Sequence, residues 1–124
     1  MKKISTPNAP KAIGPYSQAV VSNNMVFTSG QIALSPQTGE MSKGDIKEQT
    51  EQVMKNLEAV LKEAGSSFDK VIKTTCYLAD ISSFGDFNEV YGKYISSAPA
   101  RSCVAVKDLP KGALVEVDVI ALID

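Results

Sequence analysis

Near its carboxyl end the chain carries two closely spaced pairs of side chains that can bind anions or transfer protons: Arg101 and Cys103, then Glu116 and Asp118. Histidine is absent, and the sequence holds two cysteines. This composition excludes nucleophilic triads that depend on histidine, zinc sites that contain histidine, and four-cysteine zinc sites. Any catalysis must therefore use Arg, Glu, Asp, Tyr, Ser, Cys or Lys side chains, backbone groups and water.

Each pair is spaced by two residues, and alternate residues of a β-strand point to the same face of a sheet. In the predicted strand 114–123, the acidic pair alternates with an apolar set that should lie under the helices: Val115, Val117, Val119 and Ala121. In the predicted strand 102–106, Val104 and Val106 are assigned to that same helix side. The residues predicted to share the opposite face are Arg101, Cys103, Ala105, Glu116 and Asp118.

A helix over 45–64 is the clearest element of the scaffold that must hold these strands. Its apolar residues recur with a period of 3.6 and form one stripe. Asp45 and Glu48 form a capping signal at its start, and Gly65 suits the position that follows its end.

A second helix is expected to begin with Ser82 or Ser83 as its cap and to end before Pro99. Its apolar stripe is formed by Phe84, Phe87, Tyr91, Tyr94 and Ile95. We interpret the two phenylalanines as core or pocket wall.

The remaining elements follow from shorter patterns. Asn23 and Asn24 favour a tight hairpin, because asparagine tolerates positive φ. The other expected elements are an edge segment and loop over 1–16, strands 19–22 and 25–29, a loop over 30–44, and strands 70–78, 102–106 and 114–123. This order predicts an α+β fold of two layers, with both helices on one face of a mixed sheet.

The length of 124 residues fits one domain, 1–124. With 13 basic and 14 acidic residues and no long run of either sign, nothing points to a nucleic-acid-binding protein. The amino terminus lacks the apolar segment of a secretory signal, and no apolar stretch approaches the roughly 20 residues that span a bilayer. Two cysteines far apart suit a reducing compartment, so we expect a cytoplasmic protein without a membrane partner.

The sheet face opposite the helices is expected to be mixed rather than polar, since Leu114, Ile120 and Cys103 are assigned to it. Two helices cannot cover both faces of the sheet. We infer that this face packs on another copy of the chain, which places Arg101 and Glu116 near a subunit interface.

Six segments spread over the chain form a recognisable set. The longest is P-A-R-S-C-V-A-V-K-D-L-P-K-G-A-L-V-E-V at 99–117, and another is A-I-G-P-Y-S-Q-A at 12–19. The shorter ones are T-S-G-Q-I (28–32), G-D-I-K-E-Q-T (44–50), V-I-K-T-T (71–75) and F-N-E-V-Y (87–91). Together they resemble the RidA/YjgF family of reactive intermediate deaminases, in order and over essentially the whole chain.

The resemblance implies a chorismate-mutase-like fold and a homotrimer with active sites between subunits. It also implies an activity, the hydrolysis of enamine and imine acids to 2-oxo acids and ammonia. The substrates implied are 2-aminoacrylate, 2-iminopropanoate and 2-iminobutanoate. Neither a cofactor nor a metal is expected.

Arg101 and Glu116 are the catalytic residues that the resemblance implies. Arg101 is expected to bind the substrate carboxylate, for which a planar guanidinium is suited; the alternative is a surface or structural ion pair. Glu116 is expected to orient or deprotonate the attacking water and to return the proton to ammonia. Its alternative is a strand glutamate paired with a lysine or arginine across the sheet.

The other positions that match the family's pocket are Tyr16, Ser29, Gly30, Asn88 and Cys103. Tyr16 either closes the pocket or anchors its loop, and Ser29 with Gly30 either approaches the ligand closely or only ends a strand. Asn88 is either a pocket residue or a polar residue of the helix surface. Cys103 is expected to contribute through its backbone, because no histidine is available to activate its thiol.

Two other function classes stay open as alternatives. The same pocket could serve a non-catalytic sensor of carboxylate ligands, or a partner-binding regulator of purine or amino-acid metabolism. RNA cleavage, which has been attached to some relatives, is disfavoured by the balanced charge and by the absence of histidine.

Overall fold

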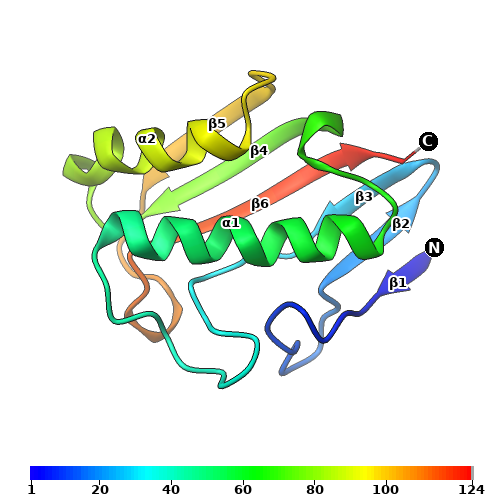
Figure 1. Cartoon of the computed structure of the whole chain (residues 1–124), viewed down its shortest axis with the longest axis horizontal. Helices are drawn as coiled ribbons and strands as arrows, with labels where there is room; N and C mark the ends of the chain where they lie inside the picture. The colour runs from blue at the N-terminus through cyan, green and yellow to red at the C-terminus, as the bar shows by residue number, and fades with distance from the viewer. Residues whose placement is uncertain (124) are drawn as a thin grey trace.

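A computed structural model describes residues 1–123. Its strands form one mixed sheet in the order β1-β2-β3-β6-β4-β5, and the two α-helices lie over one face of it (Figure 1). The strands are β1 (Lys2–Ile4), β2 (Ala19–Ser22), β3 (Met25–Thr28), β4 (Val71–Leu78), β5 (Ala100–Ala105) and β6 (Val115–Leu122), and the helices are α1 (Ile46–Glu63) and α2 (Phe84–Tyr94). The predicted α+β fold with two layers is therefore confirmed.

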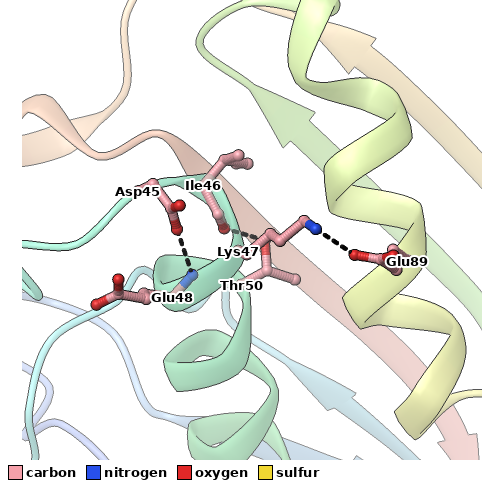
Figure 2. A network of polar contacts seen from close by, with 6 residues as sticks. All are labelled: Asp45, Ile46, Lys47, Glu48, Thr50 and Glu89. Carbon is pink, nitrogen blue, oxygen red and sulfur yellow. Dashed lines mark hydrogen bonds and ion pairs between the residues drawn. The ribbon is translucent and has the colours of Figure 1, made fainter.

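Helix α1 begins and ends where its sequence signals lie. The Asp45 carboxylate accepts a hydrogen bond from the backbone N–H of Glu48 at 3.0 Å, as Figure 2 shows. After the helix, Gly65 adopts a φ of 83°, a left-handed conformation that glycine reaches without strain. On the exposed side Lys47 forms an ion pair with Glu89 of α2, and such surface pairs add little to stability.

Helix α2 has a different cap from the one expected. The 3-10 turn Ile81–Ser83 precedes it, and the Asp80 carboxylate accepts the N–H of Ser82 at 2.9 Å. Neither Ser82 nor Ser83 makes the predicted side-chain cap, because this turn moves the first free N–H groups toward Asp80.

The amino-terminal half of the sheet follows the expected order. Strand β1 pairs with β2, and β2 pairs with β3 through Asn23 and Asn24, whose φ angles are 49° and 63°. Two left-handed residues between antiparallel strands match the twist of a hairpin, as predicted. The loop from Gly30 to Gly44 then crosses to the start of α1, and its Gln31 forms a bridge with Val117 of β6.

The core lies between the helices and one face of the sheet. Alternate residues of β4 and β6 that are buried there include Cys76, Leu78, Val115, Val117 and Val119. Helix α1 contributes its own buried stripe, in which Leu57 is completely buried. Burying one such side chain stabilises the fold by roughly 1.5–3 kcal/mol. Among residues 1–123, no helix is long and apolar enough to cross a membrane.

Candidate functional site

The carboxylate of Glu116 lies directly against the backbone of Gly30. Glu116 points from β6 to the sheet face away from the helices, since its neighbours Val115 and Val117 are buried on the helix side. Gly30 is held beside β6 because Gln31 and Val117 exchange backbone hydrogen bonds of 2.9 Å and 3.2 Å. A Cβ on Gly30 would collide with Oε2 of Glu116 and lie 2.7 Å from its Cδ, closer than real Cβ contacts, while its Cγ would be at a tight 3.0 Å. A larger residue at position 30 would therefore displace the Glu116 carboxylate.

A pocket of about 590 Å³ opens beside this contact. Tyr16, Ser29, Gly30 and Glu116 all line it, so the structure brings together four of the predicted site residues. The Ser29 hydroxyl donates to the carbonyl of Ser17 at 2.6 Å, which leaves its oxygen able to accept from a ligand. The Tyr16 ring is half-exposed (53%) at the pocket wall.

The surroundings of Glu116 favour its protonated form. Partial burial raises the pKa of Glu116, and the nearby Asp118 carboxylate raises it further. Asp118 points to the same face, as predicted, and accepts a hydrogen bond of 3.4 Å from the hydroxyl of Tyr77. Burial raises the pKa of Asp118 as well, although the Tyr77 hydrogen bond opposes this. A raised pKa makes a carboxylate a stronger proton acceptor than an ordinary glutamate.

A second group of predicted residues gathers around Arg101, under α2. The Nη1 group of Arg101 donates to Oδ1 of Asn88 at 2.6 Å. Its guanidinium carbon lies 5.1 Å from the ring centre of Tyr91 and 5.4 Å from that of Phe84, within the range of cation–π attraction. The Tyr91 hydroxyl is anchored in turn by a buried hydrogen bond of 2.8 Å to Thr74. The guanidinium is thus oriented by two rings and one amide.

This aromatic support leaves Arg101 available to a ligand. Arg101 is exposed, and one hydrogen bond to Asn88 uses only one of the five N–H donors of a guanidinium. A smaller pocket of about 390 Å³ lies beside it, lined by Asn88, Tyr91 and the connection from α2 to β5. An arginine held this way suits the two oxygens of a carboxylate.

The prediction that Arg101 and Cys103 share a face with Glu116 and Asp118 is wrong. In the sheet register Cys76 pairs with both Cys103 and Val117, which places Cys103 on the helix side. Tyr77 pairs with both Val104 and Glu116, which places these two on the uncovered side. The Arg101 and Glu116 groups therefore lie on opposite faces of the sheet.

The error has a physical cause in β5. This strand is at the edge of the sheet, and each of its two alternating sets of residues mixes apolar and polar side chains. Val104, predicted to lie on the helix side, is 47% exposed, while Cys103 packs against the core. Hydrophobic alternation identifies the buried face only when one set is clearly polar.

Cys103 is poorly suited to be a nucleophile. Burial raises the pKa of its thiol, and the opposing effect of the nearby Arg101 is smaller. Cys76, predicted to belong to the core, is fully buried, and burial raises its pKa to about 12. Both sulfurs are thus held as thiols, the unreactive form. Within residues 1–123, no three acidic or cysteine side chains gather as metal ligands.

Sequence reasoning missed Phe84 and Tyr91 as supports of Arg101. Both belong to the predicted apolar stripe of the second helix, and Phe84 was expected to be core or pocket wall, without a role toward Arg101. The signal that could have found them is their spacing around Asn88: positions 84, 88 and 91 lie on one helical face. Two rings and an amide on one face, opposite a strand with an arginine, form a support for a cation.

Comparison with known proteins gives consistent matches over nearly the whole chain. Residues 6–123 match the family model described as Endoribonuclease L-PSP. The chain is 53% identical to the putative regulator AldR of Lactococcus lactis, over 98% of this chain and 97% of that protein. It is 47% identical to the 2-iminobutanoate/2-iminopropanoate deaminase of Mus musculus, over 98% and 90%. Its structure is similar to that of Escherichia coli TdcF with bound serine, with a TM-score of 0.94, 41% identity and complete coverage of both chains.

Proposed function

This chain belongs to the endoribonuclease L-PSP family, which includes the RidA/YjgF proteins, and we propose that it hydrolyses 2-imino acids to 2-oxo acids and ammonia. The proposed substrates are 2-aminoacrylate, through its imine tautomer 2-iminopropanoate, and 2-iminobutanoate. The mouse deaminase that is 47% identical to this chain is named for the two imines. The reaction needs a carboxylate binder, a base for water and no cofactor.

The observation that carries the proposal is the Glu116 carboxylate, held against Gly30 beside the larger pocket. Glycine at this position leaves room for a water or a small substrate next to the carboxylate. The raised pKa of Glu116 suits a group that first accepts a proton and then returns it. Arg101, held over Tyr91 and Phe84, supplies the matching carboxylate-binding group.

Because Arg101 and Glu116 lie on opposite faces of the sheet, a single chain does not present both to one small substrate. We therefore propose that the active site forms between two copies of the chain: Arg101, Asn88 and Cys103 of one copy face Tyr16, Ser29, Gly30 and Glu116 of the next. The partly buried, mixed sheet face around Glu116 supports such an interface. A homotrimer, as the resemblance implies, closes this arrangement with three equivalent sites.

The proposed mechanism uses positioning and one carboxylate. Arg101 binds the substrate carboxylate through its fork of N–H groups. Glu116 takes a proton from a water molecule while the water oxygen bonds to the carbon of the protonated imine and the C=N π pair moves to nitrogen, which gives a neutral carbinolamine. Glu116 then returns the proton to the nitrogen. As the carbon–nitrogen bond breaks, the hydroxyl proton of the carbinolamine passes to Glu116 and from there to solvent, and the 2-oxo acid and ammonia leave. Positioned acid–base groups of this kind typically accelerate a reaction about 10²–10⁴-fold.

The experiment that tests this proposal generates 2-aminoacrylate or 2-iminobutanoate in the presence of the purified protein. The release of 2-oxo acid and ammonia is followed against the spontaneous rate. We expect the wild-type chain to accelerate the release and Arg101→Ala to lose that acceleration while it keeps its fold by circular dichroism. Release at the spontaneous rate with the wild-type protein would overturn the proposal.

The sensor alternative keeps some support, because one relative is named a putative regulator and the TdcF structure holds serine. In this second candidate function the chain binds small carboxylate ligands without turning them over. Tight binding of a 2-oxo acid by calorimetry, together with no acceleration of imine hydrolysis, would favour the sensor. We do not propose RNA cleavage, because the charge of the chain is balanced and histidine is absent.

A further inference from the structure

Helix α1 buries three polar side chains whose hydrogen-bond partners differ: Gln49, Thr50 and Asn56. A buried polar group is destabilising unless it is hydrogen-bonded, so each partner is informative. The Thr50 hydroxyl donates to the carbonyl of Ile46 one turn earlier, at 2.7 Å, within the helix itself (Figure 2). The two amides instead reach outside the helix.

Asn56 holds the loop that follows Gly30. Its Nδ2 group donates to the carbonyls of Leu34 at 2.9 Å and Ile32 at 3.2 Å, and its Oδ1 accepts from Gln52 at 2.9 Å. Ile32 and Leu34 both line the pocket that contains Glu116. Both N–H donors of this side chain are thus used to fix the loop to α1, and the bond from Gln52 within α1 orients the amide.

Gln49 holds the segment that leads into β6. Its Oε1 accepts the backbone N–H of Leu114 at 2.9 Å, and its Nε2 donates to the carbonyl of Ser42 at 3.3 Å. Leu114 precedes Glu116 by two residues. Helix α1 therefore anchors both segments that meet at the Gly30–Glu116 contact, the loop after Gly30 and the start of β6. Neither amide lines the pocket itself.

We propose that Asn56 and Gln49 are positioning residues, which hold the Gly30 loop against the Glu116 carboxylate in the site proposed above. This inference rests on the proposed function for its catalytic consequence. Close to Gly30 the chain is also held by the backbone bridge between Gln31 and Val117 and by the hydrogen bonds of Ser29 to Gln18 and Ser17, whereas residues 32–34 depend on Asn56 for their contact with α1. Without the Asn56 bonds, residues 32–34 separate from α1, Gly30 moves away from the carboxylate, and water reaches Glu116 from a second side.

Several charged or titratable groups face Glu116 and set the background for any pH measurement. From β6 and β4 these are Asp118 and Tyr77, and from the loops that line the pocket they are Lys11, Lys111 and Tyr16. None of them belongs to α1. A change in the titration of Glu116 after a substitution in α1 therefore reports movement of the pocket walls rather than the loss of a neighbouring charge.

The test compares Asn56→Leu, which is close in volume and removes both donors, with Thr50→Val, a matched loss of a buried hydroxyl from the same helix. The full-length proteins are labelled with 13C at the glutamate carboxyl carbon, and Glu116 is titrated by NMR. The kcat and KM for 2-iminobutanoate are measured over the same pH range. We expect Asn56→Leu to move the pKa of Glu116 toward that of an ordinary glutamate and to lower kcat about tenfold, since misplacement by about 1 Å can reduce a rate by up to about 10²-fold.

Thr50→Val should leave the pKa of Glu116 and kcat at their wild-type values. An unchanged Glu116 titration in Asn56→Leu, or an equal shift in both variants, would overturn the proposal. If Asn56→Leu does not fold, Gln52→Leu replaces it, because that change removes only the donor that orients Asn56 and should give a smaller shift in the same direction. If the wild-type chain hydrolyses no imine, the proposed function fails, while the NMR titration still decides the positioning role.

Discussion

Replacement of Gly30 by alanine tests the contact on which the proposed site depends. The added Cβ would stand 2.7 Å from Cδ of Glu116. An ordinary contact between carbon atoms begins near 3.4 Å, and Oε2 of Glu116 would be closer still, so the carboxylate must retreat by more than about 0.7 Å or rotate into another rotamer. Displacement of a catalytic group by this amount is expected to reduce kcat by about 10–10²-fold, equivalent to about 1.4–2.7 kcal/mol in activation free energy.

The same substitution should leave the fold nearly unchanged. Gly30 is not among the glycines with positive φ, so alanine can adopt its backbone conformation. The group that must move is the end of a flexible side chain, and alanine also restricts the unfolded chain. We expect the free energy of unfolding to change by less than about 1 kcal/mol.

The assay combines imine hydrolysis with thermal denaturation, and Gly85→Ala serves as the matched control. Gly85 lies in the first turn of α2, and a Cβ there would meet no atom within 4 Å. This control should keep wild-type kcat and gain about 0.5–1 kcal/mol of stability, as alanine does in a helix. Wild-type kcat in Gly30→Ala, or a loss of activity that only follows a loss of folded protein, would refute the reasoning.

Three further predictions concern the charges of Arg101 and Glu116 and the protonation of the Cys103 thiol. Arg101→Lys should raise KM by about tenfold or more with the fold intact, because an ammonium cannot form the paired hydrogen bonds of the guanidinium; an unchanged KM in steady-state kinetics would count against carboxylate binding. Glu116→Gln should raise the melting temperature at neutral pH. Folding raises the pKa of Glu116, so the stability that the protonated Glu116 contributes is lost as the pH rises through the folded-state pKa, and glutamine has no such loss. The difference should vanish on acidification below the ordinary glutamate pKa, and a melting temperature below wild type at pH 7 would contradict the assignment. Cys103→Ser should retain most of kcat, because the thiol stays protonated; complete loss would point to covalent catalysis.

The elements with local signals were predictable from the sequence almost to the residue. Helix α1 was expected over 45–64 and spans Ile46–Glu63, because its cap residue and the glycine after its end act through local hydrogen bonds and φ. The hairpin at Asn23 and Asn24 was predictable for the same reason. The cap of α2 was not, since the 3-10 turn that moves it to Asp80 depends on how the chain leaves β4.

Some contacts among the predicted site residues could be anticipated from the sequence, but their overall arrangement could not. Tyr16, Ser29, Gly30 and Glu116 do meet, and Asn88 does contact Arg101. The error concerned the side of the sheet on which Arg101 lies. In the edge strand β5 the larger hydrophobe, Val104, points away from the helices. The alternation of residues along the strand therefore predicted the wrong face for Arg101. The face on which Arg101 lies is decided by its contacts with Tyr91 and Phe84, which belong to another element, α2.

The central claim, an active site shared between two copies of the chain, is tested most directly by mixing two inactive variants. Arg101→Ala supplies intact Glu116, and Glu116→Gln supplies intact Arg101. Refolded together in equal amounts, they should recover about one quarter of wild-type activity, because a random assembly pairs the two intact groups at that fraction of its interfaces. A mixture no more active than the two variants measured separately would contradict the shared site and place both groups in a single chain.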